Sequence, residues 1–224
     1  MPFCCIMTYL GLIIFDFRSI CTIFANMNYN PNDSKWSENV ILIDADYVDK
    51  VAFDLTVNFE RMIGRRIPKA DTALWLECIA LDGGLREGNH ETQVVMIHGS
   101  RRHGMENFAP GNFAEELDGK AFKGNLGEFL ISALPVEEGM TTAADLFVES
   151  LEVIANSKEA KRIMVVPDAE KAYDRIRESM KHVDDDSKRI TVFAMQPMAG
   201  GNFRQEILGY SLMQALGIRA DEIR

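Results

Sequence analysis

Two pairs of acidic residues, each at the end of an apolar run, are the sequence feature best suited to chemistry. The pairs are Asp44 and Asp46 at the end of residues 40–46, and Asp168 and Glu170 at the end of residues 162–170. In an open parallel sheet, side chains at the carboxyl ends of neighbouring strands line one crevice, and ligands bind there. If both runs are strands of such a sheet, we expect the four carboxylates to lie close together.

Carboxylates that are crowded together repel one another unless a cation neutralises them. Mg²⁺ prefers ligands that are all oxygen, and it keeps several of its water molecules. The four acidic residues therefore predict a divalent-metal site, and such a site points to phosphate-ester chemistry.

Each of these carboxylates also has a purely structural interpretation. Asp44 and Asp168 can each cap the helix that follows, because aspartate is a preferred N-cap residue. Asp46 can be an exposed loop residue, and Glu170 can be a first-turn glutamate that the helix dipole stabilises. We favour function for Asp44 and Asp168 because each follows a run that is expected to be a buried strand.

Asp145 allows two interpretations that the sequence does not separate. Residues 142–145 read Thr-Ala-Ala-Asp, which matches a capping box in which the acidic side chain reaches back to the first residue. Alternatively, Asp145 is a third metal carboxylate at the start of the helix that follows the third strand.

A basic segment follows the second expected strand, on the same rim of the sheet. Its residues Ser100, Arg101 and Arg102 can hold substrate phosphates, because a guanidinium binds phosphate through two parallel hydrogen bonds. The alternative is ordinary surface charge in a loop.

The elements that position these residues follow from the hydrophobic pattern. Continuous apolar runs of four to eight residues are typical of strands buried on both faces. The expected strands are residues 40–43, 93–98, 128–134, 163–166 and 190–195. The expected helices are residues 50–63, 70–81, 142–155, 170–182 and 205–216, with one short helical turn near 113–117 inside a long irregular connection, 99–125. This alternation predicts an α/β fold with a mainly parallel five-stranded sheet.

Composition narrows the class of protein. The formal net charge of -10 over 224 residues argues against sequence-blind coating of nucleic acid, which needs a basic surface. It does not exclude a nucleic-acid enzyme with a local basic rim. The four cysteines have no metal-like spacing and suggest a reducing compartment, so we expect a cytoplasmic location. The four histidines form no H-x-x-x-H pair, so zinc is not expected.

The first 26 residues differ from the rest of the chain. Residues 1–15 carry no charge, but a bilayer span needs about 20 uninterrupted apolar residues, so no stable membrane insertion is expected. No basic residue precedes the apolar stretch as in a signal peptide. We predict an N-terminal extension and polar linker at residues 1–39, followed by a single domain at 40–224. Met27 as the natural start, a weak anchor and an added helix stay open as explanations of the extension.

Three short motifs in this order resemble the NYN branch of the PIN-like ribonucleases. They are Ile-Asp-Ala-Asp at residues 43–46, Thr-Ala-Ala-Asp-Leu at 142–146 and Val-Val-Pro-Asp-Ala-Glu at 165–170. The resemblance implies a three-layer α/β/α, PIN-like (Rossmann-like) fold and an endonuclease that uses Mg²⁺ or Mn²⁺ to activate water on an RNA phosphodiester. The family's acidic positions carry onto Asp44, Asp145, Asp168 and Glu170.

In the mechanism that this resemblance implies, Asp44 and Asp168 hold the metal, while Asp145 and Glu170 complete its shell or act as general base. RNA is the expected partner, and assembly into a homo-oligomer stays open. The chain departs from the family pattern at Tyr47, where Asn is frequent, at Pro167, and at Lys171, so the retention of catalysis is also open.

Two alternatives remain beside this interpretation. Residues 44–48 fit the D-x-D-x-[T/V] motif of haloacid-dehalogenase-like phosphatases, in which one aspartate attacks phosphorus and the other acts as acid and base. Asp44 and Asp46 would take these roles, with Ser100 as the hydroxyl residue of the second motif. The other alternative is a non-catalytic binding module on the same fold.

Overall fold

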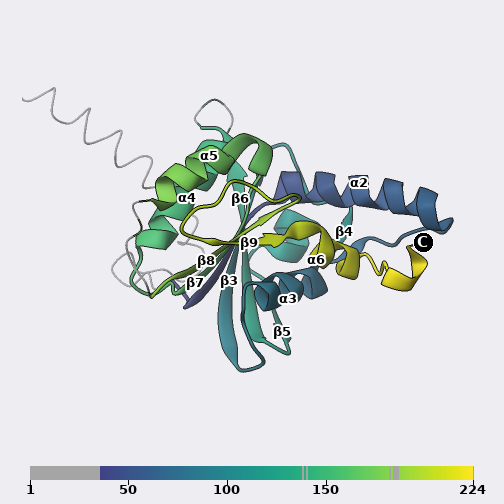
Figure 1. Cartoon of the computed structure of the whole chain (residues 1–224), viewed down its shortest axis with the longest axis horizontal. Helices are drawn as coiled ribbons and strands as arrows, with labels where there is room; N and C mark the ends of the chain where they lie inside the picture. The colour runs from purple at the N-terminus through teal and green to yellow at the C-terminus, as the bar shows by residue number, and fades with distance from the viewer. Residues whose placement is uncertain (1–35, 138, 140, 182, 184–186, 224) are drawn as a thin grey trace, which may run out of the picture. The chain divides into compact units, whose positions relative to one another are not determined.

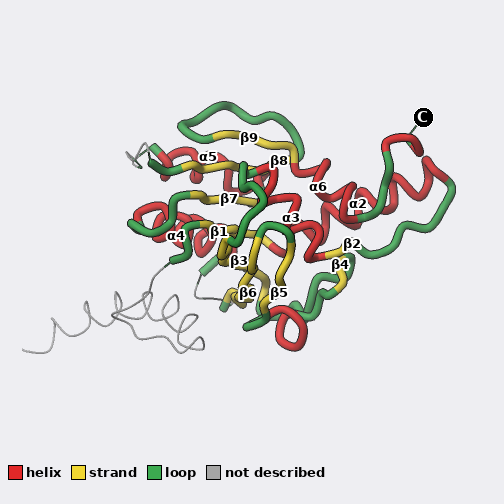
Figure 2. The backbone as a smooth tube through the Cα atoms, turned by 90° about the horizontal axis from the view of Figure 1, so that it is seen from below, coloured by secondary structure: helices red, strands yellow, loops and turns green. Residues whose placement is uncertain are grey.

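A seven-stranded sheet forms the centre of the computed structural model, which describes residues 36–137, 139, 141–181, 183 and 187–223. The strand order is β5-β6-β3-β1-β7-β8-β9, and all neighbours are parallel except β5 and β6. Figure 2 shows the strands side by side in this order. Their bounds are β1 Asn39–Asp44, β3 His90–Gly99, β5 Ala121–Gly124, β6 Gly127–Val136, β7 Arg162–Val166, β8 Arg189–Ala194 and β9 Arg204–Ile207.

All five expected strands are present, as β1, β3, β6, β7 and β8, and the α/β class with a mainly parallel sheet is confirmed. The two further strands, β5 and β9, lie at the edges of the sheet. The predicted helix at residues 205–216 is wrong in its first three residues, because β9 extends to Ile207 and the helix begins at Leu208. An edge strand with the sequence Arg-Gln-Glu-Ile shows no apolar run, so its pattern could not identify it.

Within the described residues, five α-helices cover the two faces of the sheet (Figure 1). They are α2 Ala45–Ile63, α3 Thr72–Asp82, α4 Ala143–Asn156, α5 Ala169–Met180 and α6 Leu208–Ala215. Helices α4 and α5 pack against each other, as do α3 and α6. Ile41 and Ile43 of β1 belong to the core on the side of α2, α3 and α6, and the alternation of a strand sends Val40 and Leu42 to the side of α4 and α5.

Helix α2 begins five residues earlier than the pattern predicted. The buried Asp44 is its N-cap, and Asp44 Oδ1 accepts a hydrogen bond of 3.0 Å from the Tyr47 backbone N–H. This satisfies one of the N–H groups that a helix start leaves without an intrahelical partner. Asp46 therefore lies in the first turn of a helix, and its interpretation as a loop residue is wrong. The helix ends at Gly64, whose φ of 70° is the left-handed conformation that glycine adopts at little cost.

The long connection from β3 to β5 is more ordered than expected. It contains β4 (Phe108–Ala109), which pairs with β2 (Ala70–Asp71), and the single π-helical turn η1 (Phe113–Leu117). The predicted helical turn at residues 113–117 is thus confirmed. A 3-10 turn, η2, follows near the C-terminus at Ala220–Glu222.

The direction of travel through the sheet reverses between β1 and β7. From β1 the chain moves to β3 and then β6 on one side, and α4 then carries it to β7 on the other side of β1. In sequence order, the five expected strands have the spatial order 3-2-1-4-5. The crevice outside the carboxyl ends of the strands at such a reversal is the usual place for a ligand in open α/β sheets.

The N-terminal extension predicted for residues 1–39 falls mostly on residues 1–35, outside the described residues, and stays a prediction. His182, the end of the helix predicted at residues 170–182, lies outside them as well. Within the described part of the chain, no helix combines the length and the apolar character needed to cross a membrane.

Candidate acidic site at the carboxyl edge of the sheet

Asp44 is the last residue of β1 and is 9% exposed. Burial is the largest cause that raises its pKa, from 3.8 to about 6. The Tyr47 N–H lowers this pKa, whereas the negative charges of Asp46 and Asp168 raise it. Asp44 therefore caps a helix, as its structural interpretation expects, and titrates close to neutral pH. Its functional interpretation stays a prediction.

Asp168 lies two residues beyond the end of β7 and is 8% exposed. It occupies the N-cap position of α5, but its side chain makes no capping hydrogen bond. Instead, Asp168 Oδ2 lies 2.7 Å from Lys171 Nζ, and Asp168 Oδ1 is buried with no hydrogen-bond partner among the described residues. A buried oxygen without a partner is unfavourable, so capping does not explain this aspartate.

Asp44 and Asp168, hereafter the acidic pair, are coupled through charge. Asp44 ends β1 and Asp168 follows β7, and the strand order of the sheet reverses between these two strands. The charge of Asp168 raises the pKa of Asp44, and the charge of Lys171 lowers it. Burial, with the charges of Asp168, Glu170 and Asp44, raises the pKa of Tyr47 to about 12. The acids that follow β1 and β7 thus interact through charge, and Lys171 and Tyr47 take part in the same interactions.

A pocket of about 360 Å³ lies beside the acidic pair. Its lining comes from the start of α2, from α5, and from the end of β8 with the segment that follows. The lining residues are Tyr47, Ala169, Glu170, Lys171, Tyr173, Asp174, Ala194, Met195, Gln196 and Met198. Glu170 is exposed in the first turn of α5. The pocket therefore offers apolar side chains next to carboxylates and one ammonium group.

Asp46 faces β3 rather than β7. Its Oδ2 accepts a 2.8 Å hydrogen bond from the Gly99 N–H, and its Oδ1 lies 3.6 Å from Arg102 Nε. A Cβ atom at Gly99 would stand 3.2 Å from Asp46 Oδ2, so the absence of a side chain there permits this close approach. Asp46 joins the start of α2 to the end of β3.

Asp49 is a residue that the sequence reasoning missed. It is 4% exposed, forms an ion pair with Arg102 Nη2, and accepts hydrogen bonds from Asn107 N at 2.8 Å and from Asn107 Nδ2 at 3.0 Å. Arg102 is therefore paired with two carboxylates of α2. These carboxylates offset the positive charge with which Arg102 would bind a substrate phosphate. The spacing of Asp46 and Asp49, one helical turn apart, is the signal that could have shown this pairing.

The other two residues of the basic segment, Ser100 and Arg101, are exposed in the turn after β3. Their predicted contact with substrate stays a prediction.

Asp145 lies in the first turn of α4, and its environment agrees with the capping interpretation. The Asp145 N–H donates to Thr142 Oγ1 at 3.1 Å, and Thr142 Oγ1 donates to Asp145 Oδ2 at 2.5 Å. Asp145 Oδ1 also lies 2.7 Å from Arg175 Nη2 on α5. The hydrogen bonds from Thr142 and Arg175 lower the pKa of Asp145. Its charge is thus paired with α5, and the charges that act on Asp44 come from Asp46, Asp168 and Lys171.

Comparison with family models gives one match, a family of unknown function (DUF6621), over residues 33–223. The chain belongs to this family. The matched region begins before β1 and ends after α6, so the acidic pair and the pocket beside it lie inside the DUF6621 region. Searches among curated proteins and among solved structures found no match.

Among the described residues of this DUF6621 protein, no group of three or more His, Cys, Asp or Glu side chains is arranged to hold a metal ion. The predicted set of five carboxylates (Asp44, Asp46, Asp145, Asp168 and Glu170) is therefore not gathered in one place. The donors of the acidic pair alone still suit Mg²⁺, because proteins usually bind this ion through one or two carboxylates, water and substrate phosphate. The buried Asp168 Oδ1, which lacks a partner, is a donor of this kind.

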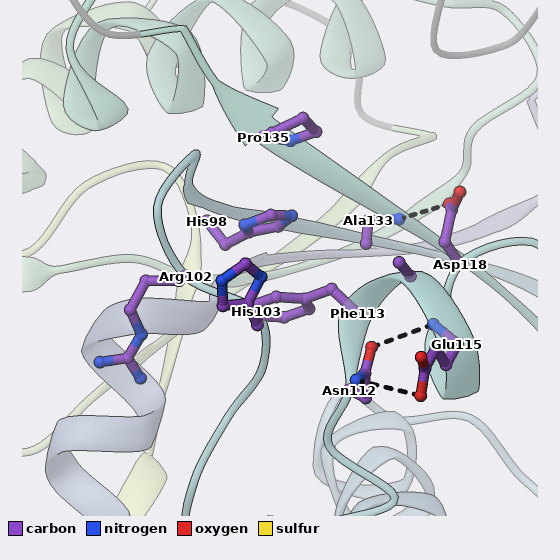
Figure 3. A pocket seen from close by; sticks show the side chains of 10 residues that line it. His98, Arg102, His103, Asn112, Phe113, Glu115, Asp118, Ala133 and Pro135 are labelled. Carbon is purple, nitrogen blue, oxygen red and sulfur yellow. Dashed lines mark hydrogen bonds between the residues drawn. The ribbon is translucent and has the colours of Figure 1, made fainter.

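A second pocket, of about 530 Å³, lies at the carboxyl ends of β3 and β6 in the DUF6621 fold (Figure 3). His98 stacks on Phe113 there, with ring centroids 3.8 Å apart and planes 10° apart. His98 Nδ1 lies 3.0 Å from the Gly99 carbonyl oxygen, and burial is the largest cause that lowers the pKa of His98. The contact between these two rings could not be predicted from the hydrophobic pattern, because Phe113 lies in the long connection after β3.

Proposed function

We propose that this DUF6621 protein hydrolyses RNA phosphodiesters with Mg²⁺ or Mn²⁺ bound at Asp44 and Asp168. One observation carries the proposal: a buried pair of carboxylates lies where the strand order reverses, and one of its oxygens, Asp168 Oδ1, has no partner among the described residues. The reversal of strand order between β1 and β7 supports the same proposal, because ligands bind outside the carboxyl ends of strands at such a point. The acidic motifs that carry the PIN-like resemblance supply both members of the pair.

A divalent cation at the acidic pair would neutralise the carboxylates, orient a phosphate and lower the pKa of a water molecule. Asp168 is the principal ligand in this proposal because its two oxygens point to no helix N–H group. Asp44 contributes the oxygen that is not used to cap α2.

Asp44 is mainly ionised at pH 7, because its pKa of about 6 lies below that pH. It can therefore offer a charged oxygen to the cation, and a bound cation would favour the ionised form further. Tyr47, whose pKa is about 12, keeps its hydroxyl proton and can donate a hydrogen bond to the substrate.

Lys171 provides the positive charge of the proposed site. Its ammonium group lies 2.7 Å from Asp168 Oδ2, and the hydrogen bond that it donates to Asp168 raises the pKa of Lys171. Its side chain is 75% exposed, so it can turn from Asp168 toward a bound phosphate. Lys171 would thus stabilise the negative charge that develops on the phosphate oxygens.

The proposal assigns no ligand role to Asp145, although the resemblance implies one. Asp145 is paired with Arg175, and it would need to leave that pair before it could reach the acidic pair. In the proposed mechanism, Asp145 and Arg175 connect α4 to α5 and so help to fix the first turns of α5, where Lys171 lies.

A phosphomonoesterase is the second candidate, and Lys171 is the observation that favours it. In this mechanism Asp44 attacks phosphorus, the ester oxygen leaves with a proton from Asp46, and water then hydrolyses the aspartyl phosphate. Lys171 would support the attacking carboxylate through its charge. The hydrogen bond from the Gly99 N–H to Asp46 Oδ2 speaks against it, because it turns Asp46 toward β3.

The deciding experiment supplies Mn²⁺ and compares a labelled single-stranded RNA with a small aryl phosphate. The proteins are the wild type, Asp168→Asn, and Asp54→Asn as the matched control, since Asp54 is exposed on α2. Cleavage of RNA by the wild type and the control, together with its loss in Asp168→Asn, supports the nuclease. Hydrolysis of the aryl phosphate alone overturns it in favour of the phosphatase, and inactivity on both substrates favours a binding module.

A further inference from the structure

Arginine is the first residue of three neighbouring strands, at the edge of the sheet opposite to the acidic pair. These residues are Arg162 of β7, Arg189 of β8 and Arg204 of β9. Arg162 and Arg189 are direct partners in the register, and Arg204 is the partner of Thr191, two residues beyond Arg189. Because alternate residues of a strand share a face, all three side chains lie on the same face of the sheet.

That face is the one covered by the C-terminal end of α3. Arg162 Nη1 donates a 2.9 Å hydrogen bond to the carbonyl oxygen of Gly83, the residue that ends α3. A Cβ atom at Gly84 would stand 3.0 Å from Arg162 Nη1 and 3.8 Å from Arg204 Nη1. The guanidinium groups of β7 and β9 therefore converge on the same turn.

A fourth arginine, Arg86, follows this turn. The pKa of Arg162 is lowered first by burial and then by the positive charge of Arg189, with smaller contributions from Arg86 and Arg204, whereas Glu38 raises it. Like charges directly opposite each other on a sheet are destabilising. These four residues are hereafter the arginine cluster. The fold holds them together against their mutual repulsion, although the chain as a whole has a net charge of -10.

Carboxylates offset only part of this charge. Arg204 Nη2 lies 3.1 Å from Glu206 Oε1, and the charge of Glu206 also raises the pKa of Asp82. In the ranges that the structure describes, no ion pair neutralises Arg86, Arg162 or Arg189. The Arg162 Nε–H is buried and has no hydrogen-bond partner within the part of the chain that the structure describes. A buried donor without an acceptor is unfavourable, so a ligand that accepts this hydrogen bond would be stabilised here.

We propose that the arginine cluster binds a phosphate group. A guanidinium presents parallel N–H groups that match two oxygens of a phosphate, so several arginines on one face form a specific oxyanion site. A bound phosphate would accept the hydrogen bond of Arg162 Nε–H and screen the repulsion among the guanidinium groups. The proposal goes beyond the proposed function and does not depend on it, because the cluster lies at the opposite edge of the sheet.

The phosphate can belong to a small phosphorylated molecule or to the backbone of RNA, since the recognised group is the same. The two sources differ in how the cluster contributes to binding. A small ligand needs the cluster alone, whereas RNA binding would lose affinity and salt dependence when arginines are removed, because each backbone contact releases counterions.

The test titrates inorganic phosphate into the full-length protein by calorimetry, against sodium chloride at the same ionic strength. The variants are Arg86→Ala/Arg189→Ala and the matched control Arg66→Ala/Arg219→Ala. The control residues are exposed elsewhere, with Arg66 94% and Arg219 72% exposed. We expect the wild type and the control to bind phosphate, and the cluster variant to bind it at least tenfold more weakly. Arg189→Gln, which keeps a long polar side chain, serves if the double variant does not fold.

A second titration uses a short single-stranded RNA. If the cluster variant loses affinity for phosphate and for RNA alike, the site takes backbone phosphates. If it loses phosphate binding alone, the ligand is a small phosphorylated molecule. Both results support the site. Phosphate binding no stronger than that of chloride, or an equal loss in the control variant, would overturn it as non-specific attraction to surface charge.

Discussion

Lys171 Nζ lies 2.7 Å from Asp168 Oδ2, so the acidic residue that follows β7 has its counter-charge one helical turn away on α5. The other oxygen, Asp168 Oδ1, is buried and has no hydrogen-bond partner in the described ranges. A cation that binds Asp168 must therefore compete with the ammonium group for one oxygen and can use the other directly.

Replacing this lysine should strengthen metal binding if the proposed function is correct. Lys171→Gln removes the competing charge, so we expect Mn²⁺ to bind at least threefold more tightly, which corresponds to about 0.7 kcal/mol. Asp168→Asn should instead weaken the binding at least tenfold. Calorimetric titration of Mn²⁺ into the three proteins measures both effects. Weaker binding by Lys171→Gln would show that the ammonium group does not compete with the metal.

The pKa of Asp44 predicts a specific dependence of stability on pH. Because the folded-state pKa is about 6 and the ordinary value is 3.8, the folded protein binds the proton more strongly than the unfolded chain. The contribution of Asp44 is thus most favourable below pH 4 and is lost as the pH rises through 6. Asp44→Asn should relieve the resulting destabilisation of up to about 3 kcal/mol at pH 8. Unfolding by urea at pH 4 and pH 8 checks this, and an equal difference between variant and wild type at both pH values would contradict it.

Asp49 should matter to stability more than any exposed acid of α2. Asp49→Ala leaves the Asn107 N–H and one side of Arg102 without acceptors. We expect a loss of about 2 kcal/mol, less than for a fully buried ion pair because the Arg102 side chain is 39% exposed. The exposed control Asp54→Ala should stay within about 0.5 kcal/mol of the wild type. Similar losses of stability in the two variants would refute the claim that the buried contacts of Asp49 stabilise the fold.

Replacing Asp145 tests whether the metal site has two carboxylates or the larger set that the resemblance implies. Asp145→Asn removes the ion pair with Arg175, whose partners are both exposed by about 40% or more, so the melting temperature should change by less than about 2 °C. The affinity for Mn²⁺ should stay within twofold of the wild-type value. A tenfold loss of affinity with an unchanged melting temperature would restore Asp145 as a metal ligand.

The arginine cluster predicts opposite effects for two neighbouring arginines. Arg189→Gln removes a like charge and no hydrogen bond within the described residues, so stability at low salt should be unchanged or higher. Arg162→Gln removes the hydrogen bond to Gly83 and should lower stability by about 1 kcal/mol. Urea unfolding at low and high salt provides the comparison, and a stability loss in Arg189→Gln would mean that its charge is already neutralised.

Much of the fold could be predicted from the sequence because its strands are buried on both faces. The apolar side chains of residues 40–43 are removed from water on both faces only in a sheet that helices cover, and residues 163–166 repeat this pattern. The edge strand β9 could not be found in the same way, since its side chains are polar and its pairing with β8 depends on backbone hydrogen bonds that every sequence can make.

The site could be predicted only in part, for a similar reason. The strand ends place Asp44 and Asp168 at one edge, and topology alone brings them together. The partners of each side chain depend instead on local packing. Arg102 pairs with Asp49, and Asp145 pairs with Arg175, and neither pairing follows from strand order. Residue type and position therefore indicated the acidic pair, but not which neighbouring charges were already neutralised.

The two edge strands limit how this protein can associate. Each is four residues long, and they carry Lys123 on β5 and Arg204 and Glu206 on β9. Short, charged edge strands discourage an extended chain from adding to a sheet, because a new strand would gain few hydrogen bonds and would bring charges together. Two copies are therefore not expected to join by continuing the sheet, and the same edges protect the protein against fibre-like aggregation.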